Sequence, residues 1–74
     1  MIRLKFERTR RGISQEALGT LARVHQPDIA QIELGRLIPR VAVLERLGRV
    51  LDVPPDQLLK PVEIIKPETS EVAR

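Results

Sequence analysis

Two segments with the apolar spacing of helices follow each other with almost no chain between them. The first is predicted over about residues 15–23, where the apolar residues at helical intervals are Ala17, Leu18, Leu21 and Ala22. The second is predicted over about residues 27–34, with Ile29 and Ile32 on one face. Two helices joined by a turn of only a few residues form a helix-turn-helix unit, and this strongly limits the possible folds.

The rest of the chain up to residue 60 also favours short helices. A first helix is predicted over about residues 2–11, closed by Gly12, and Ser14 is suited to cap the second helix. Residues 41–51 carry one apolar stripe, and the prolines of "VPPDQLL" open a last short helix. We therefore predict an all-α domain of five helices over residues 1–60, followed by an extended or partly disordered tail over residues 61–74.

Composition argues against several classes of function. Phe6 is the only aromatic residue, so the core must consist of Leu, Ile, Val and Ala, which suits packed helices. The chain has no cysteine and a single histidine, His25, so we expect no metal site, no cofactor and no enzymatic activity. No apolar run reaches the length of a membrane-spanning helix and no secretion signal follows Met1, so we expect a cytoplasmic protein without a membrane partner.

The positive charge lies in the first half of the chain. Residues 1–40 carry eight cationic and four anionic side chains, a net charge of +4. Residues 41–74 carry five cationic and six anionic side chains, a net charge of −1. This division favours a polyanion as the partner of the first half and a different contact for the second half.

Thirteen residues follow the pattern of one known family at fixed spacing. They are Leu4, Lys5, Arg8, Gly12, Ile13, Ser14, Gln15, Leu18, Val24, Ile29, Ile32, Glu33 and Gly35. With these residues the chain resembles the lambda-repressor-like helix-turn-helix family, also called the XRE or Cro type, over residues 1 to about 60. The resemblance implies a sequence-specific regulator of transcription, typically a repressor, that binds double-stranded DNA as a homodimer in a prokaryotic or phage setting.

The second helix of the unit is the expected DNA reader. With Ile29 and Ile32 turned inward, the opposite side consists of Gln26, Pro27, Ala30, Gln31 and Leu34, which we call the reading face. Its amides can bond adenine, and its short side chains permit close approach to a major groove. The expected phosphate contacts are Gln15, Arg10, Arg11, Arg36 and Arg40. The resemblance further implies a largely buried ion pair between Arg8 and Glu33.

The start of the reading helix is open to two interpretations. Propensity places Gln26 at the N-cap and Pro27 at the first helical position. The family pattern places His25 at the N-cap and Pro27 one position later, and we favour this second interpretation. His25 is then a turn or capping residue rather than a base reader.

Three aliphatic residues depart from the family pattern. Leu34, Leu37 and Ile38 stand where polar residues are usual. They could contact thymine methyl groups, cover the core, or form a surface for a protein partner. The last possibility supports an alternative function, a protein-binding module on the same fold that has lost or weakened its DNA binding.

Dimerisation is expected at the other end of the chain. A homodimer would read two half-sites about 34 Å apart, one turn of DNA. The predicted contact residues are Leu58, Leu59, Val62 and Ile64, which end the last helix and begin the tail. The alternative is a disordered tail without a role in association.

Overall fold

Four α-helices and one short 3-10 helix make up the described part of the chain. The computed structural model describes residues 1–63. Its elements are α1 Arg3–Arg10, α2 Gln15–Ala22, α3 Gln26–Glu33, α4 Val41–Leu51 and the 3-10 helix η1 Pro55–Gln57. Within these residues there is no strand, only an isolated antiparallel bridge between Ile2 and Pro61. The prediction of an all-helical domain is confirmed for residues 1–63, and no helix there is long and apolar enough to cross a membrane.

The predicted last short helix is a 3-10 helix and not an α-helix. Residues 53–59 contain only the three-residue 3-10 helix η1. Pro55 begins this helix, and Pro61 follows six positions later, so the segment is too short for a regular α-helix. The fold therefore has four α-helices in residues 1–63.

The helix ends follow local sequence signals. Ser14 caps α2, and its Oγ accepts a hydrogen bond of 2.9 Å from the backbone N–H of Ala17. Gly12 closes α1 with a positive φ of 69°. α2 and α4 end alike, with Arg23 and Asp52 at φ 60° and 58°. These turns reverse the chain tightly after each helix.

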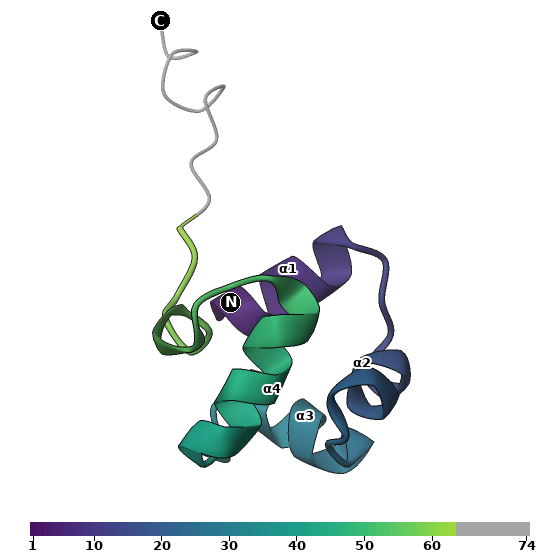
Figure 1. Ribbon diagram of the computed structural model, residues 1–74. Helices are drawn as coiled ribbons and strands as arrows, with labels where there is room; N and C mark the ends of the chain where they lie inside the picture. Colours follow the sequence, from purple (N-terminus) through teal and green to yellow (C-terminus); the bar gives the residue numbers. More distant parts are fainter. Residues whose placement is uncertain (64–74) are drawn as a thin grey trace, which may run out of the picture.

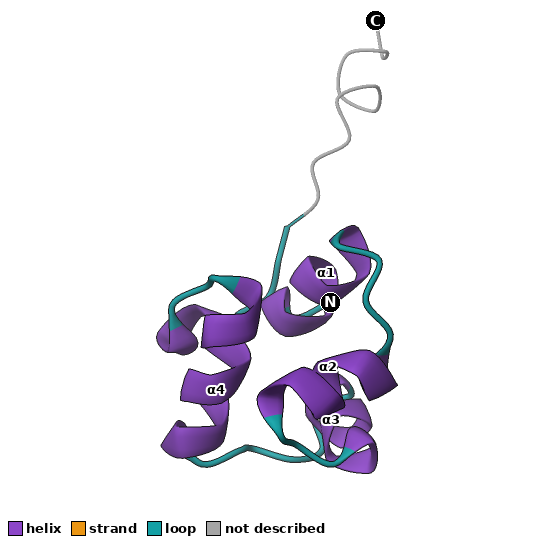
Figure 2. Ribbon diagram, turned by 45° about the vertical axis from the view of Figure 1, so that its right-hand side comes forward, coloured by secondary structure: helices purple, strands orange, loops and turns teal. Residues whose placement is uncertain are grey.

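One apolar core joins the four α-helices. Its fully or nearly fully buried residues are Leu4, Leu18, Ala22, Ile29, Ile32, Leu47, Leu51, Val53 and Leu58. α2 packs against both α3 and α4, and Figure 2 shows α2 and α3 together on one side of the domain with α4 beside them. Because this core anchors one face of α3, the opposite face of the helix is held outward.

The two ends of the described chain lie side by side (Figure 1). The backbone N–H of Arg3 donates to the Lys60 carbonyl at 2.8 Å, and that of Val62 donates to the Met1 carbonyl at 2.9 Å. The backbone pairing thus continues to Val62, two residues past the predicted end of the domain at residue 60. Ile64, one of the four predicted dimer contacts, lies outside the described residues.

Candidate nucleic-acid interface

α3 has a buried face and an exposed face. Ile29 and Ile32 are 0% and 1% exposed and belong to the core. On the reading face, Ala30 is half-buried and the other four residues, Gln26, Pro27, Gln31 and Leu34, are exposed. The structure therefore leaves the whole predicted reading face on the outside of the domain, with Leu34 as the residue that ends the helix.

The helix begins as the family pattern predicted. His25 is the N-cap residue, and its carbonyl accepts from the backbone N–H groups of Asp28 and Ile29 at 3.0 and 3.2 Å. Pro27 stands at the second helical position, where its missing N–H leaves no unpaired donor. The prediction of His25 as the cap is confirmed, and the propensity-based placement of Gln26 there is wrong.

The structure brings Arg8 and Glu33 together. Arg8 Nε and Nη2 donate to Glu33 Oε2 and Oε1 at 2.6 and 3.0 Å, and Arg8 Nη1 donates to the Ile13 carbonyl at 2.8 Å. The two side chains are 10% and 3% exposed. This bidentate pair joins α1 to the end of α3, and it fixes the orientation of α3 relative to the rest of the domain.

Two glutamine side chains extend this ion pair to the surface. Gln15 Nε2 donates to Glu33 Oε1 at 2.9 Å, and Gln15 Oε1 accepts from Gln26 Nε2 at 2.9 Å. We call these two bonds the glutamine relay. Gln15 is half-buried and Gln26 is exposed, so the relay runs from inside the domain to the first residue of α3. The sequence alone did not indicate that Gln15 bonds to the reading face.

Arg10 and Arg11 are held by an acidic residue that sequence analysis did not single out. Glu7, only 3% exposed, accepts from Arg10 at 2.6 Å, from Arg11, and from Arg3 at 2.7 Å. These hydrogen bonds, those from Arg10 and Arg11 first, lower the pKa of the Glu7 carboxyl from 4.5 to about 2. The signal for this cluster was present in the helical spacing, since Arg3, Arg10 and Arg11 lie three or four residues from Glu7.

The predicted phosphate-contacting arginines thus fall into different groups. Arg11 Nη2 also donates to the Leu51 carbonyl at 2.6 Å, which makes Arg11 a link between α1 and α4. Arg10 is more exposed and lies 5.9 Å from the centre of the Phe6 ring. Arg36 and Arg40 are exposed and form no ion pair with any residue among 1–63, so their charges face solvent.

The sequence matches the model of one protein family over most of its length. Residues 2–60 match a family described as a helix-turn-helix domain. The chain belongs to this helix-turn-helix domain family. Such domains bind DNA through the second helix of the unit, and they are typically non-enzymatic. The comparison with curated proteins gave no significant match.

An apolar surface borders the reading face of the helix-turn-helix domain. Leu34, Leu37, Ile38 and Val41 are 61%, 37%, 82% and 68% exposed. A surface hollow of about 300 Å³ lies beside them, lined in part by Leu37, Ile38 and Val43. Of the interpretations kept open for Leu34, Leu37 and Ile38, covering the core does not fit Leu34 and Ile38, because both are mostly exposed. Val41 was not recognised from the sequence as part of this surface.

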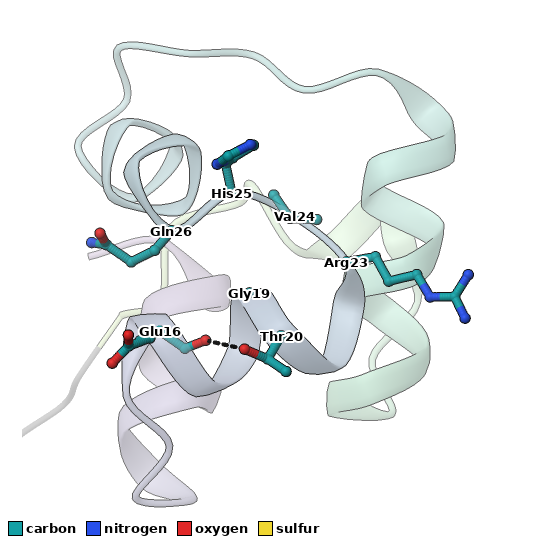
Figure 3. Close-up of a pocket in the computed structure, with 7 residues that line it drawn as sticks. All are labelled: Glu16, Gly19, Thr20, Arg23, Val24, His25 and Gln26. Atoms are coloured by element: carbon teal, nitrogen blue, oxygen red, sulfur yellow. Dashed lines mark hydrogen bonds between the residues drawn. The ribbon is translucent and has the colours of Figure 1, made fainter.

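The turn of the helix-turn-helix domain forms a second, shallow hollow (Figure 3). It has a volume of about 420 Å³, and Gly19, Val24, His25 and Gln26 are among the residues that line it. Figure 3 shows the side chains of Gln26 and Arg23 pointing in opposite directions from this turn. Arg46 reaches the same region from α4, where its Nε donates to the Ala22 carbonyl at 2.9 Å and so satisfies the end of α2.

The structure places the predicted dimer contacts in different environments. Leu58 is 0% exposed and is a core residue, so its prediction as a dimer contact is wrong. Its side chain belongs to the same buried apolar cluster as Leu4 and Leu51. Leu59 and Val62 are half-buried and keep part of their surface available.

Proposed function

We propose that this chain is a sequence-specific regulator of transcription of the lambda-repressor-like, XRE or Cro-type group. It binds double-stranded DNA by inserting α3 into the major groove. The observation that carries this proposal is the exposed outer face of α3, where amides and small side chains replace the charged residues of an ordinary solvated helix. Such a face can approach base edges closely and form hydrogen bonds with them.

The phosphate contacts that we propose surround the reading face. Arg36 and Arg40 follow α3 in the chain and have free cationic groups, as judged within residues 1–63. Gln15 at the start of α2 keeps one amide N–H outside the glutamine relay for a phosphate oxygen. Arg10 contributes charge from the end of α1, whereas Arg11 acts mainly inside the domain.

We further propose that the chain acts as a cytoplasmic homodimer and represses transcription. Repression needs only occupancy of a site that overlaps a promoter. Two copies add the binding energies of two half-sites, which a single short reading helix does not supply. Leu59, Val62 and the residues that follow them are the proposed contacts, since Leu58 belongs to the core.

The salt dependence of binding tests the DNA-binding function. A duplex that covers the DNA flanking the gene for this protein is a suitable first probe, because a footprint there also shows whether the protein controls its own promoter. We expect the affinity to fall steeply with salt, and Arg36→Gln or Arg40→Gln to reduce the slope by about 0.9 for each lost phosphate contact. Arg49→Gln, an exposed arginine near the other end of α4, is the matched control and should leave the slope unchanged.

Base preference tests whether α3 is the reader. Gln31→Ala and Gln26→Ala remove the two amides of the reading face, so each should relax sequence preference by about 1 to 3 kcal/mol. The helix content of both variants should remain that of the wild type, because both residues are exposed. If both variants select the same sites as the wild type with equal affinity, α3 does not read bases.

The apolar surface supports a second candidate function. Leu34, Leu37, Ile38 and Val41 could bind a protein partner on a helix-turn-helix domain that has lost its DNA contacts. The same salt titration separates the two functions, since only phosphate contacts produce a steep slope. Binding that is insensitive to salt, or absent for every duplex, would favour the protein-binding function.

A further inference from the structure

Most of the exposed large apolar side chains in residues 1–63 gather in one short segment. Six side chains of this kind are exposed there, and four of them belong to the segment that ends α3 and leads into α4. These four are the residues of the apolar surface, Leu34, Leu37, Ile38 and Val41. A single exposed apolar residue is ordinary on a protein, whereas a group of them marks a surface that contacts another molecule.

The hollow beside the apolar surface gives a partner a place to anchor. It has a volume of about 300 Å³, and six of the eight residues that line it are apolar, among them Ile32 of α3 and Val43 of α4. The other two, Asp28 and Arg40, are exposed. The central residue of a protein interface is commonly an apolar side chain that fills such a hollow.

Duplex DNA does not bury the apolar surface. Base pairs present polar edges in the major groove, and the C5 methyl of thymine is the apolar group among them. Ile38 and Val41 are 82% and 68% exposed, and both follow α3 in the chain rather than lying on its reading face. Sugar and phosphate groups beside these side chains would leave them in water. The function proposed above therefore does not account for the exposure of Ile38 and Val41.

A second copy of the chain fits the apolar surface poorly. Contacts between identical chains are most often two-fold symmetric, so the same surface of each copy faces itself. Arg36 and Arg40 lie between the apolar residues in the sequence, and both are exposed. A two-fold contact would bring these cations close to those of the other copy, and like charges across an interface cost binding energy.

The charges around the apolar surface favour an acidic partner. Arg36 and Arg40 form no ion pair with any residue among 1–63. Within the described chain, Asp28 is the only acidic residue that lines the hollow, so the cationic groups exceed the anionic ones. Complementary charge selects the partner of an interface. A protein segment with an apolar side chain between carboxylates matches both the hollow and its cationic surroundings.

We propose that the apolar surface docks an acidic protein segment that displaces DNA. An apolar side chain of the segment occupies the hollow, and its carboxylates pair with Arg36 and Arg40. The same two arginines are the proposed phosphate contacts, and Leu34 belongs to both the reading face and the apolar surface. The segment and a duplex therefore exclude each other. The displacement rests on the proposed function, whereas the docking of the segment does not.

A peptide selection tests the chemistry of the partner. The full-length protein is immobilised, and the probe is a phage library of random linear peptides. We expect the enriched peptides to carry an apolar residue flanked by Asp or Glu, and a synthetic copy of such a peptide to compete with duplex DNA for the protein. Enrichment of no peptide, enrichment of peptides without acidic residues, or a peptide that binds together with the duplex would overturn the proposal.

Ile38→Ser tests whether the selected peptide binds at the apolar surface. Because Ile38 is exposed, the variant should keep the helix content of the wild type, and it should keep the affinity for duplex DNA. We expect it to weaken the peptide about 30-fold, the loss for a central anchor of an interface. Leu21→Ser, 61% exposed on α2, is the matched control and should bind the peptide as the wild type does. Full peptide affinity of Ile38→Ser would overturn the docking site.

Arg40→Gln tests whether the peptide and the duplex use the same cation. We expect this variant to weaken the peptide about two- to five-fold, as for an exposed ion pair, in addition to its smaller salt slope with DNA. Arg49→Gln, the control of the salt titration, should change neither. If Arg40→Gln and Arg36→Gln both bind the peptide with wild-type affinity, the carboxylates do not pair with these arginines and the proposal fails.

Other occupants of the apolar surface give different results with Ile38→Ser. Vesicles of phosphatidylglycerol that bind the wild type but not this variant would assign the surface to a membrane. A homodimer that the variant converts into monomers in sedimentation would assign it to a second copy, and a loss of duplex affinity would assign it to DNA. Each of these results would overturn the acidic segment as the occupant.

The proposed function fails by a separate measurement. Absence of salt-dependent binding to every duplex would overturn the proposed function and, with it, the displacement of DNA. The loss of peptide affinity in Ile38→Ser does not depend on DNA, so it would still decide whether the acidic segment docks at the apolar surface.

Discussion

Loss of one member of the Arg8–Glu33 pair should destabilise the domain by about 3 to 5 kcal/mol. The pair is 10% and 3% exposed, and two short hydrogen bonds connect its charged groups. With Glu33→Leu, the Arg8 guanidinium would stay buried with only the Ile13 carbonyl as acceptor. With Arg8→Met, the Glu33 carboxylate would keep only the Gln15 amide.

This loss is large for so small a protein. A chain of 74 residues has a total stability of roughly 4 to 11 kcal/mol at 0.05 to 0.15 kcal/mol per residue. Each single variant should therefore be marginally stable, whereas the double variant Arg8→Met with Glu33→Leu buries no charge and should recover most of the loss. The coupling between the two sites then approaches the sum of the two single losses.

Unfolding in urea, followed by circular dichroism of the helices, measures this cycle, because the chain has no Trp or Tyr for fluorescence. Arg3→Ala is the control, since the Arg3–Glu7 pair has one partner that is 37% exposed and should contribute under about 1 kcal/mol. Purely additive losses at Arg8 and Glu33 would refute the argument that each charge depends on the other.

Three further predictions concern acid, packing and association. Because the pKa of Glu7 is lowered to about 2, the ionised carboxylate stabilises the folded domain by about 3 kcal/mol at most. This stabilisation is complete above about pH 5 and is lost as the pH falls toward 2. In urea titrations, Glu7→Gln should show a smaller loss of unfolding free energy between pH 5 and pH 2. Gly19→Ala or Gly48→Ala places a Cβ 2.5 Å from a backbone carbonyl oxygen, so each should lower the free energy of unfolding by about 1 to 3 kcal/mol. The exposed control Arg49→Ala should lower it by less than about 0.5 kcal/mol. Wild-type stability of the glycine variants would contradict this close contact. Truncation after Lys60, which removes Val62 and the residues that follow it, should convert a homodimer into monomers in sedimentation. An unchanged dimer would remove the tail from the interface.

The four α-helices could be predicted because their signals are local. Ser14, Gly12 and the apolar spacing of each segment act over a few residues, so the bounds agree with the structure to within one or two positions. The segment after Asp52 could not be predicted in the same way. Its apolar residues suit a helix, but Pro61 follows Pro55 so closely that only the short 3-10 helix η1 forms.

The burial of individual side chains could not be predicted from the sequence. The helical spacing permits pairs of Arg10 and Arg11 with Glu7, and the structure adds that Glu7 is only 3% exposed and accepts from both. Leu58 appeared available because it lies near the end of the domain, yet the fold buries it completely. Exposure depends on contacts between residues distant in sequence, and local spacing does not show these contacts.

Glu33 connects the buried ion pair to the proposed reading face, and one variant should separate its two contributions. The same carboxylate accepts from Arg8 inside the domain and from Gln15 in the glutamine relay. In the double variant Arg8→Met with Glu33→Leu, the fold should be restored while Gln15 loses the acceptor that orients its amide. We therefore expect a stable protein that binds duplex DNA with the wild-type salt slope but with a weaker sequence preference than the wild type. A stable double variant with the full wild-type preference would show that Gln26 does not depend on the relay.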